Sequence, residues 1–187
     1  MIIGITGTNG AGKGVVVDYL KSKGFAHYSN SGYISEELVR RGMELTRSNM
    51  RLVGNEFRER YGAGYLAEVA LQKAAESGVE NIANEAIRST GEAQKIKEAG
   101  GYLILVDADR KTRYERIFKR KSGKDLIDFD TFVEQEEREW YGTEGEHDMN
   151  IRKVMDMADF SILNDSTVEE LYKKIDEVLS KIKTSAS

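Results

Sequence analysis

Short apolar runs alternate with segments of helical periodicity along the whole chain. Five of these runs have the length and composition of β-strands, and they cover residues 2–6, 25–28, 79–87, 102–106 and 160–163. No polar residue with a charge or amide interrupts 102–106, as in a strand buried on both faces of a parallel sheet. The run 79–87 is the least regular, since it contains Asn81 and Asn84. The alternation predicts a parallel sheet flanked by helices.

The segments between the apolar runs have helical spacing, which predicts helices over residues 13–23, 110–121 and 129–141. Asp109 is placed to cap the second helix, whose apolar face consists of Tyr114, Ile117 and Phe118. A capping box at Ser166 and Glu169 predicts a closing helix with an apolar stripe, made of Val168, Leu171, Ile175, Val178, Leu179 and Ile182. The final residues, 183–187, are expected to form a frayed tail.

The first predicted strand leads directly into a glycine-rich segment that ends in a lysine. Residues 7–14 match the phosphate-binding pattern G-x-x-x-x-G-K, and the predicted helix follows at once. Glycines let successive backbone N–H groups point at one anion, and the helix directs its positive N-terminal end there. Lys13 adds a charge for the β- and γ-phosphates, and we expect its side chain to point into solvent while the site is empty. The segment predicts a nucleoside triphosphate bound by Gly7, Thr8, Asn9, Gly10, Ala11, Gly12, Lys13, Gly14 and Val15.

The two positions after Lys13 depart from most phosphate-binding loops. Gly14 and Val15 stand where a serine or threonine usually supplies a hydroxyl to Mg²⁺. Mg²⁺ keeps several waters and is held mainly by substrate phosphates, so ATP with Mg²⁺ stays the expected cofactor pair.

Composition narrows the class of protein further. The chain has 187 residues, enough for one domain over residues 1–187 with a substantial core. It contains no cysteine and only two histidines, which excludes disulfides and cysteine nucleophiles and disfavours a zinc site. Its net charge of −4, with acids and bases interleaved, indicates no nucleic-acid partner, and no apolar run reaches the roughly 20 residues of a membrane span. We therefore expect a cytoplasmic enzyme, monomeric or homodimeric, that acts on small molecules.

Arginines at helical spacing are candidates for neutralising phosphates, because phosphoryl transfer depends mainly on positioning and charge stabilisation. One helix face carries Arg47, Arg51 and Arg58, and a second carries Arg113, Arg116 and Arg120. The alternative is two solvated faces whose arginines pair with neighbouring acids.

A third candidate element lies at the end of the strand predicted within residues 79–87. Ligands of parallel sheets bind beyond the carboxyl ends of the strands, which places Glu85 and Arg88 beside the phosphate loop. Glu85 can hold a Mg²⁺-bound water, and Arg88 can bind the phosphate of an acceptor. The alternative is an ordinary strand-to-helix turn in which Glu85 neighbours a helix cap.

In this order the motifs resemble those of P-loop nucleotide kinases, close to the adenylate-kinase-related proteins of archaea and to dephospho-CoA kinases. Residues 29–34 are similar to the S-x-G-D segment that opens the acceptor-binding helices, but Tyr33 replaces the aspartate and the arginine that usually follows is missing. Residues 85–88 are similar to D-G-x-x-R, with glutamate for the aspartate and Ala86 for the glycine.

The resemblance also implies a lid and an adenine pocket. Residues 113–120 resemble the R-x-x-R pattern that leads into a lid, and residues 134–138 resemble its return helix, where Arg138 takes the place of an arginine that reaches the transferring group. The lid lies within about residues 113–141, with its tip at residues 121–124. Residues 158–165 are similar to A-D-x-x-I-x-N, whose loop lines the adenine pocket, and this implies a cofactor-binding role for Asn164.

These observations predict an α/β, three-layer P-loop NTPase domain with a parallel five-stranded sheet, helices on both faces and a short helical lid. The implied function is ATP-dependent transfer of the γ-phosphoryl group to a nucleotide-like acceptor, stabilised by Lys13, Arg88, Arg116, Arg120 and Arg138. A nucleoside monophosphate is the leading acceptor, and dephospho-CoA is the alternative. A non-catalytic nucleotide-sensing module remains an alternative of another class, because the hydroxyl is absent at Gly14 and Val15 and the acceptor segment is altered.

Overall fold

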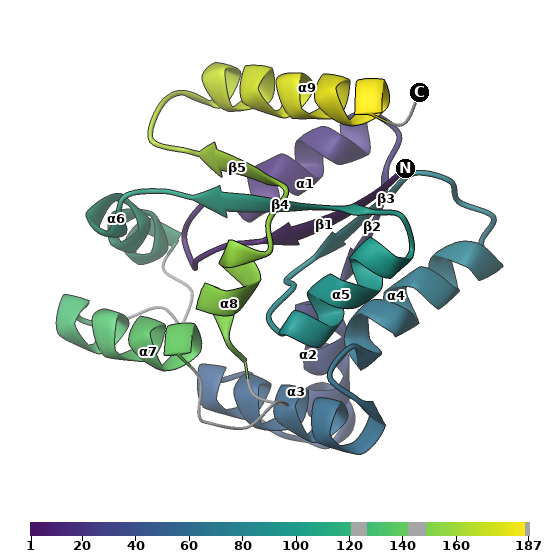
Figure 1. Cartoon of the computed structure of the whole chain (residues 1–187). Helices are drawn as coiled ribbons and strands as arrows, with labels where there is room; N and C mark the ends of the chain where they lie inside the picture. Colours follow the sequence, from purple (N-terminus) through teal and green to yellow (C-terminus); the bar gives the residue numbers. More distant parts are fainter. Residues whose placement is uncertain (121–126, 142–148, 186–187) are drawn as a thin grey trace.

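The computed structural model describes residues 1–120, 127–141 and 149–185. Five parallel strands form one sheet in the order β2-β3-β1-β4-β5 (Figure 1). Their bounds are β1 Ile2–Thr6, β2 Ala26–Ser29, β3 Ile82–Glu85, β4 Tyr102–Asp107 and β5 Phe160–Leu163. The predicted parallel five-stranded sheet is confirmed. The irregular run 79–87 contains a strand only over its centre, β3. Asn84 lies within this strand and Asn81 directly precedes it.

Helices fill the connections between the strands. Their bounds are α1 Lys13–Ser22, α2 Asn30–Arg40, α3 Arg47–Tyr61, α4 Tyr65–Glu76, α5 Thr90–Glu98, α6 Arg110–Arg120, α7 Phe129–Tyr141, α8 Ile151–Asp156 and α9 Val168–Ser185. The structure thus bears out the three helices predicted at residues 13–23, 110–121 and 129–141 to within one residue at either end. Within the described ranges, no helix is long and apolar enough to cross a membrane.

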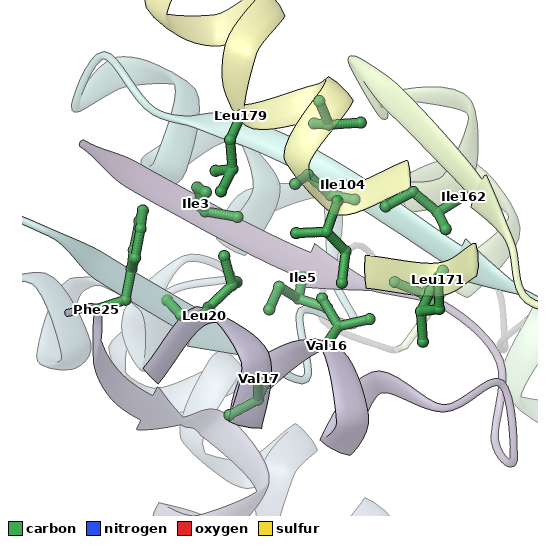
Figure 2. Packing of buried hydrophobic residues seen from close by; sticks show 14 of the residues in the cluster. Ile3, Ile5, Val16, Val17, Leu20, Phe25, Ile104, Ile162, Leu171 and Leu179 are labelled. Atoms are coloured by element: carbon green, nitrogen blue, oxygen red, sulfur yellow. The ribbon is translucent and has the colours of Figure 1, made fainter. Parts of the chain in front are cut away.

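Helices cover both faces of the sheet and make the molecule three layers deep (Figure 1). On one face, α1 and α9 pack on alternate strand residues, among them Ile3, Ile5 and Ile104 (Figure 2). On the other face, residues of α4, α5 and α8 pack against Leu103 and Ile87. Side chains of one strand therefore point into both cores, and this burial on two faces explains the uninterrupted apolar run of β4.

Local hydrogen bonds fix the starts of α6 and α9, and packing holds the end of α9; both ends of α9 differ from the prediction. Asp109 caps α6 as expected, accepting from the N–H groups of Lys111 and Thr112 at 3.0 and 3.2 Å. The closing helix α9 is capped by Thr167 and not by Ser166, since Glu170 N donates to the Thr167 hydroxyl at 3.3 Å. The tail prediction was also wrong at its start, because α9 continues through Ser185. The apolar stripe explains this, as Ile182 is buried in the core and holds the last turns on the sheet.

The sheet order determines where a ligand can bind. β1 lies between β3 and β4, so the chain leaves β1 at the point where successive connections run to opposite sides of the sheet. The register pairs Ile5 with Glu85 on one side and with Ile104 on the other. The loop after β1, the acid that ends β3 and the end of β4 therefore meet at one edge of the sheet.

Candidate active site

The loop between β1 and α1 adopts a conformation that glycine alone permits at its tightest points. Gly7 has φ 134°, and a Cβ there would lie 1.9 Å from the carbonyl oxygen of Val106 in β4. Gly12, the N-cap of α1, has φ 96°, and no side chain caps the helix. The first turn of α1 therefore presents backbone N–H groups and a positive helix end without a protein side chain to neutralise them. This geometry is that of an anion-binding loop.

The side chain of Lys13 folds back onto this loop. The prediction that it points into solvent while the site is empty was wrong. Its ammonium group donates to the carbonyl oxygens of Gly7 and Thr8 at 3.0 and 2.7 Å, and the side chain is only 9% exposed. Burial and then the neighbouring charge of Arg88 lower the pKa of Lys13 to about 7, although Glu85 and Glu139 act in the opposite direction. The empty loop thus uses its lysine as an internal hydrogen-bond donor, and an incoming phosphate must draw it away from those carbonyl groups.

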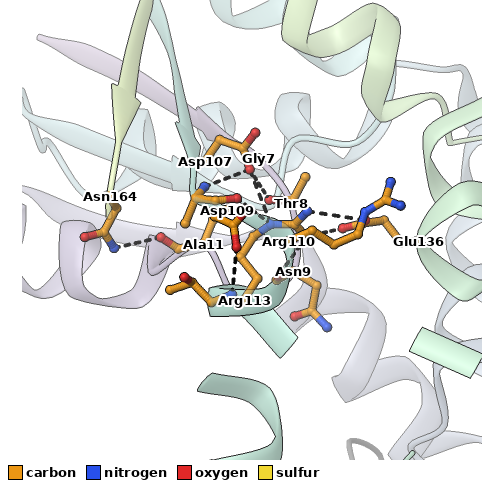
Figure 3. Close-up of polar contacts among 12 residues, drawn as sticks. Gly7, Thr8, Asn9, Ala11, Asp107, Asp109, Arg110, Arg113, Glu136 and Asn164 are labelled. Atoms are coloured by element: carbon orange, nitrogen blue, oxygen red, sulfur yellow. Dashed lines mark hydrogen bonds and ion pairs between the residues drawn. The ribbon is translucent and has the colours of Figure 1, made fainter. Parts of the chain in front are cut away.

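A chain of polar contacts ties the other side of the loop to α6 and α7 (Figure 3). The Thr8 hydroxyl donates to the Asp107 carboxylate at 2.6 Å, and Asp107 lies 3.6 Å from the Arg113 guanidinium. Arg113 forms a buried ion pair with Glu136 of α7, which also pairs with Arg110 at 2.9 Å. The Glu136 carboxylate neutralises the charge of Arg113, and the pair anchors α7 to α6. Arg113 does not line the cavity, unlike Arg116 and Arg120 of the same helix.

Asn164 supports the loop from behind. Its side-chain amide donates to the Ala11 carbonyl oxygen at 2.8 Å (Figure 3). Its backbone carbonyl oxygen accepts from Arg116 at 2.9 Å. A Cβ on Gly12 would lie 2.3 Å from the Asn164 amide nitrogen, so this contact itself requires glycine. Asn164 therefore stabilises the phosphate loop through Ala11 and positions Arg116, which lines the cavity.

The turn that follows β3 brings Glu85 and Arg88 to the loop. Ala86 occupies the left-handed region with φ 67°, an unusual conformation for alanine, at the position where the resembling kinases have glycine. Glu85 accepts from the Ser29 hydroxyl at 3.1 Å and lies 3.9 Å from the His27 ring. Burial raises the pKa of Glu85, but His27, Lys13 and Arg88 together outweigh burial and hold it below its ordinary value. Glu85 is therefore a carboxylate at neutral pH.

A cavity of about 600 Å³ lies in front of the loop and gathers residues from across the sequence. The loop contributes Asn9, Gly10, Gly12, Lys13, Gly14 and Val15, and β3 and its turn contribute Glu85, Ala86 and Arg88. The acceptor-side helices line it with Ser31, Ile34, Arg47, Met50, Arg51 and Arg58. Arg116 and Arg120 reach it from α6, and Glu139 from α7. The volume is sufficient for a ligand of nucleotide size.

Not every arginine of the two predicted helix faces can offer its charge to a ligand in this cavity. Arg58 is 1% exposed and its Nε donates to Glu92, itself fully buried, at 2.9 Å, so its charge is neutralised within the fold. One guanidinium nitrogen of Arg116, Nη1, is buried and has no hydrogen-bond partner within the part of the chain that the structure describes. An unpartnered buried donor on a cavity wall is the arrangement that a bound anion would satisfy.

Arg138 lies outside the cavity, in contrast to the role implied by the resemblance. Its side chain is 71% exposed and lies 4.0 Å from Glu134, one turn away on α7. The next residue, Glu139, faces the cavity instead. The predicted lid tip at residues 121–124 falls outside the described residues.

The donor set around the loop suits Mg²⁺ only as an ion carried by phosphates. Among the described residues, no three histidines or acids cluster as metal ligands, and Gly14 and Val15 supply no hydroxyl. The ionised Glu85 lies on the cavity wall, and its role in holding a Mg²⁺-bound water stays a prediction. When bound, Mg²⁺ would neutralise the β- and γ-phosphates.

Three site residues were not recognised in the sequence. Asp107 orients Thr8, Glu136 anchors α7, and Glu139 enters the cavity between arginines of α3 and of the β3 turn. Asp107 did carry a signal, because it is the acid that ends the most apolar strand of the chain. The two glutamates lie in a helix rich in acids, where periodicity separates the buried from the exposed ones poorly.

The low pKa of Lys13 leads to a testable prediction about ATP binding. A phosphate stabilises the charged ammonium, so its pKa must rise on binding, and at pH 8 the complex should take up most of one proton. ATP affinity should accordingly fall between pH 6.5 and 8.5. Calorimetry in buffers of different ionisation enthalpy measures this uptake, and the Lys13→Arg variant is the control because its side chain stays charged. Equal proton uptake by both proteins would contradict the prediction.

The loop, the sheet order and the cavity together define a P-loop kinase-like domain. The chain belongs to the AAA domain family, whose model matches residues 3–142. It also belongs to the UPF0200 proteins. It is 31% identical over 182 residues to the UPF0200 protein of Sulfurisphaera tokodaii, and the match covers 97% of each chain. Among solved structures it is similar to a shikimate kinase from Bacteroides thetaiotaomicron, with a TM-score of 0.55, 18% identity and coverage of 95% of this chain and 97% of that one.

A dephospho-CoA kinase from Campylobacter jejuni has a TM-score of 0.50 and 13% identity, with 96% of both chains covered. At these identities the likeness shows the fold alone. The resemblance to P-loop kinases is confirmed, and so is the predicted α/β fold class. The fold supports a kinase acting on a nucleotide or another small molecule.

Proposed function

We propose that this protein is an ATP-dependent phosphotransferase that moves the γ-phosphoryl group of ATP to a nucleotide-like acceptor, with a nucleoside monophosphate as the leading acceptor and dephospho-CoA as the alternative. One observation carries the proposal. The phosphate loop, the β3 turn and arginines from both the acceptor-side helices and α6 line a single cavity. A module that only binds nucleotide needs the loop, whereas a transferase also needs a second anion site in line with it.

On the donor side, the uncapped start of α1 and Lys13 would bind the β- and γ-phosphates of ATP. Arg116 and Arg120 of α6 line the same cavity and would approach the same phosphates, and the Nη1 of Arg116, which has no hydrogen-bond partner among the described residues, would donate to one of them. Preorganised positive groups of this kind stabilise the charge that spreads over the transferring group. ATP with Mg²⁺ is the donor that this arrangement fits, and Glu85 would hold a metal-bound water.

On the acceptor side, Arg88 is placed to fix the acceptor. Its guanidinium lies on the cavity wall, 3.4 Å from the Gly7 carbonyl oxygen, and Arg47 faces it from α3. An acceptor oxygen held there attacks the γ-phosphorus as the bond to the β–γ bridging oxygen breaks, and ADP leaves with that oxygen. A phosphate acceptor needs no general base, because its oxygen is already ionised at neutral pH. The apolar side chains of Ile34 and Met50 beside the arginines suit the uncharged part of such an acceptor.

The direct test is a coupled assay for ADP release over a panel of nucleoside monophosphates and dephospho-CoA. Release of ADP that depends on one member of the panel would establish the transferase and its acceptor. ADP release with ATP alone, independent of every acceptor, would instead indicate a hydrolase.

The non-catalytic sensor is the second candidate, and the absence of a hydroxyl at Gly14 and Val15 favours it. Hydrogen exchange separates the two functions. In a transferase, α6 and α7 should become fully protected only when both substrates are present, because closure around ATP alone would leave water in the place of the acceptor and allow hydrolysis of ATP. A bisubstrate mimic, adenosine joined to the acceptor through a polyphosphate, should therefore protect both helices well beyond ATP.

ATP without any acceptor is the matched control for this exchange experiment. A sensor has no second substrate to await, so ATP by itself would produce the full protection. If ATP saturates the protection and no panel member yields ADP, the transferase proposal is wrong and the sensor is correct.

A further inference from the structure

A carboxylate already occupies the cavity where two arginines converge. Glu139 of α7 lies with one oxygen 3.6 Å from Arg47 Nη1 and with the other 3.6 Å from Arg88 Nη1. The three side chains come from α7, α3 and the turn after β3, and each is about one-fifth exposed or less. The carboxylate therefore bridges two guanidinium groups that come from different elements of the fold.

The two contacts of Glu139 differ from the structural ion pairs of the same region. At 3.6 Å they are longer than hydrogen bonds, whereas the buried pair of Arg58 and Glu92 has its donor and acceptor atoms 2.9 Å apart. Loose, partly solvated pairs contribute little to stability. The bridge is thus easily displaced by an anion with better geometry for the two guanidinium groups, such as a phosphate that accepts from both.

Glu139 lies close enough to the phosphate loop for its charge to affect Lys13. Its charge acts on Lys13, raising the pKa of that ammonium against the effect of burial. A dianionic group placed between Arg47 and Arg88 would therefore lie in the same cavity as Lys13 and would meet the like charge of Glu139.

A different residue holds α7 in place. One turn before Glu139, the buried Glu136 pairs with Arg110 and Arg113 and so anchors the helix to α6 and, through Asp107, to the phosphate loop. Removing the charge of Glu139 leaves this anchor intact. The chain thus separates the residue that positions α7 from the residue that enters the acceptor end of the cavity.

We propose that Glu139 is a specificity-determining residue, a resident counter-anion of Arg47 and Arg88 that an acceptor must displace. Only a ligand with enough negative charge displaces the Glu139 carboxylate. A dianionic phosphate therefore binds both arginines, whereas neutral or singly charged ligands do not. This inference deepens the proposed function, on which it rests for the identity of the acceptor end of the cavity. Its test uses binding alone and does not depend on turnover.

The experiment compares the binding of inorganic phosphate to the wild type, Glu139→Gln and Glu137→Gln at constant ionic strength. Trp140, the single tryptophan of the chain, adjoins Glu139 and provides a fluorescence signal. Glu137→Gln is the matched control, since it removes the same charge from an exposed position of the same helix. We expect Glu139→Gln to bind phosphate about tenfold more tightly than the wild type, and Glu137→Gln to remain within about twofold.

A double-variant cycle assigns the gain to the bridge. In an Arg47→Gln background, Glu139→Gln should improve phosphate binding by less than about twofold, because the counter-anion has lost one of its partners. Binding at the phosphate loop alone would give the same gain with and without Arg47 and would overturn the proposal. Unchanged or weaker binding by Glu139→Gln, or no phosphate binding by any variant, would overturn it as well.

Titration of the same proteins with ADP and Mg²⁺ separates the two proposals. Absence of ADP binding would contradict the proposed function while the phosphate comparison still tests Glu139. Normal ADP binding together with equal phosphate affinities in the wild type and Glu139→Gln would refute the role of Glu139 alone.

Discussion

Replacing Lys13 with alanine is expected to weaken ATP binding about a hundredfold and to abolish phosphoryl transfer. The charged hydrogen bonds between an ammonium and the β- and γ-phosphates are among the strongest that the cavity offers. Calorimetry at matched salt measures the loss of affinity, and the ADP-release assay measures the loss of transfer. ATP binding at the wild-type level by Lys13→Ala would show that residues 7–14 do not bind the donor phosphates.

The structure adds a requirement to this experiment, because Lys13 is part of the empty loop. Its ammonium satisfies the carbonyl groups of Gly7 and Thr8, and alanine leaves them without that donor. Circular dichroism should therefore establish that the variant is folded before affinities are compared. Lys21→Ala is the matched control, since Lys21 lies on the same helix, is exposed, and should leave both ATP binding and transfer unchanged.

Replacing Arg88 with lysine is expected to lower kcat/KM for the acceptor about thirtyfold while ATP affinity changes less than about twofold. A guanidinium presents two parallel N–H groups to a phosphate, and an ammonium group cannot reproduce this fork. Losing one charged hydrogen bond in the transition state accounts for an effect of this size. Steady-state kinetics with the acceptor identified in the panel, together with ATP calorimetry, provides both numbers.

The position of Arg88 makes the opposite outcome informative. Its guanidinium also lies 3.4 Å from the Gly7 carbonyl oxygen, so a parallel loss of ATP affinity would assign Arg88 to the donor phosphates. No change in either quantity would make it a structural residue of the β3 turn. Arg152→Lys is the control, because Arg152 is exposed on α8 and pairs only weakly with Asp156 at 3.8 Å.

Local signals in the sequence were sufficient for most of the fold. The phosphate loop could be recognised because its glycines, lysine and flanking strand and helix are contiguous, and contiguous residues have little freedom in how they fold. Strands β1 and β5 were predicted to the residue, and β4 was predicted apart from its final Asp107. The closing helix was predicted from its stripe, but its cap was not, since Ser166 and Thr167 both carry a hydroxyl that can cap a helix, and the structure uses Thr167.

The arginines show why the site itself could not be completed from the sequence. A helical wheel establishes that Arg47, Arg51 and Arg58 share a face, but it does not identify what that face meets. Packing against α5 gave Arg58 a buried partner in Glu92, and packing against α7 did the same for Arg113, so both charges are spent within the fold.

The sequence by itself therefore determined the anion-binding loop, the parallel sheet and the P-loop kinase-like class of domain, because each depends on spacing along the chain. Only the tertiary structure decided which charges remain available to a ligand. It turned Arg138 toward solvent and Glu139 into the cavity, although the two are neighbours on one helix. The physical reason is that the free energy of a charge depends on its burial and its partners, and those partners come from segments far apart in the sequence.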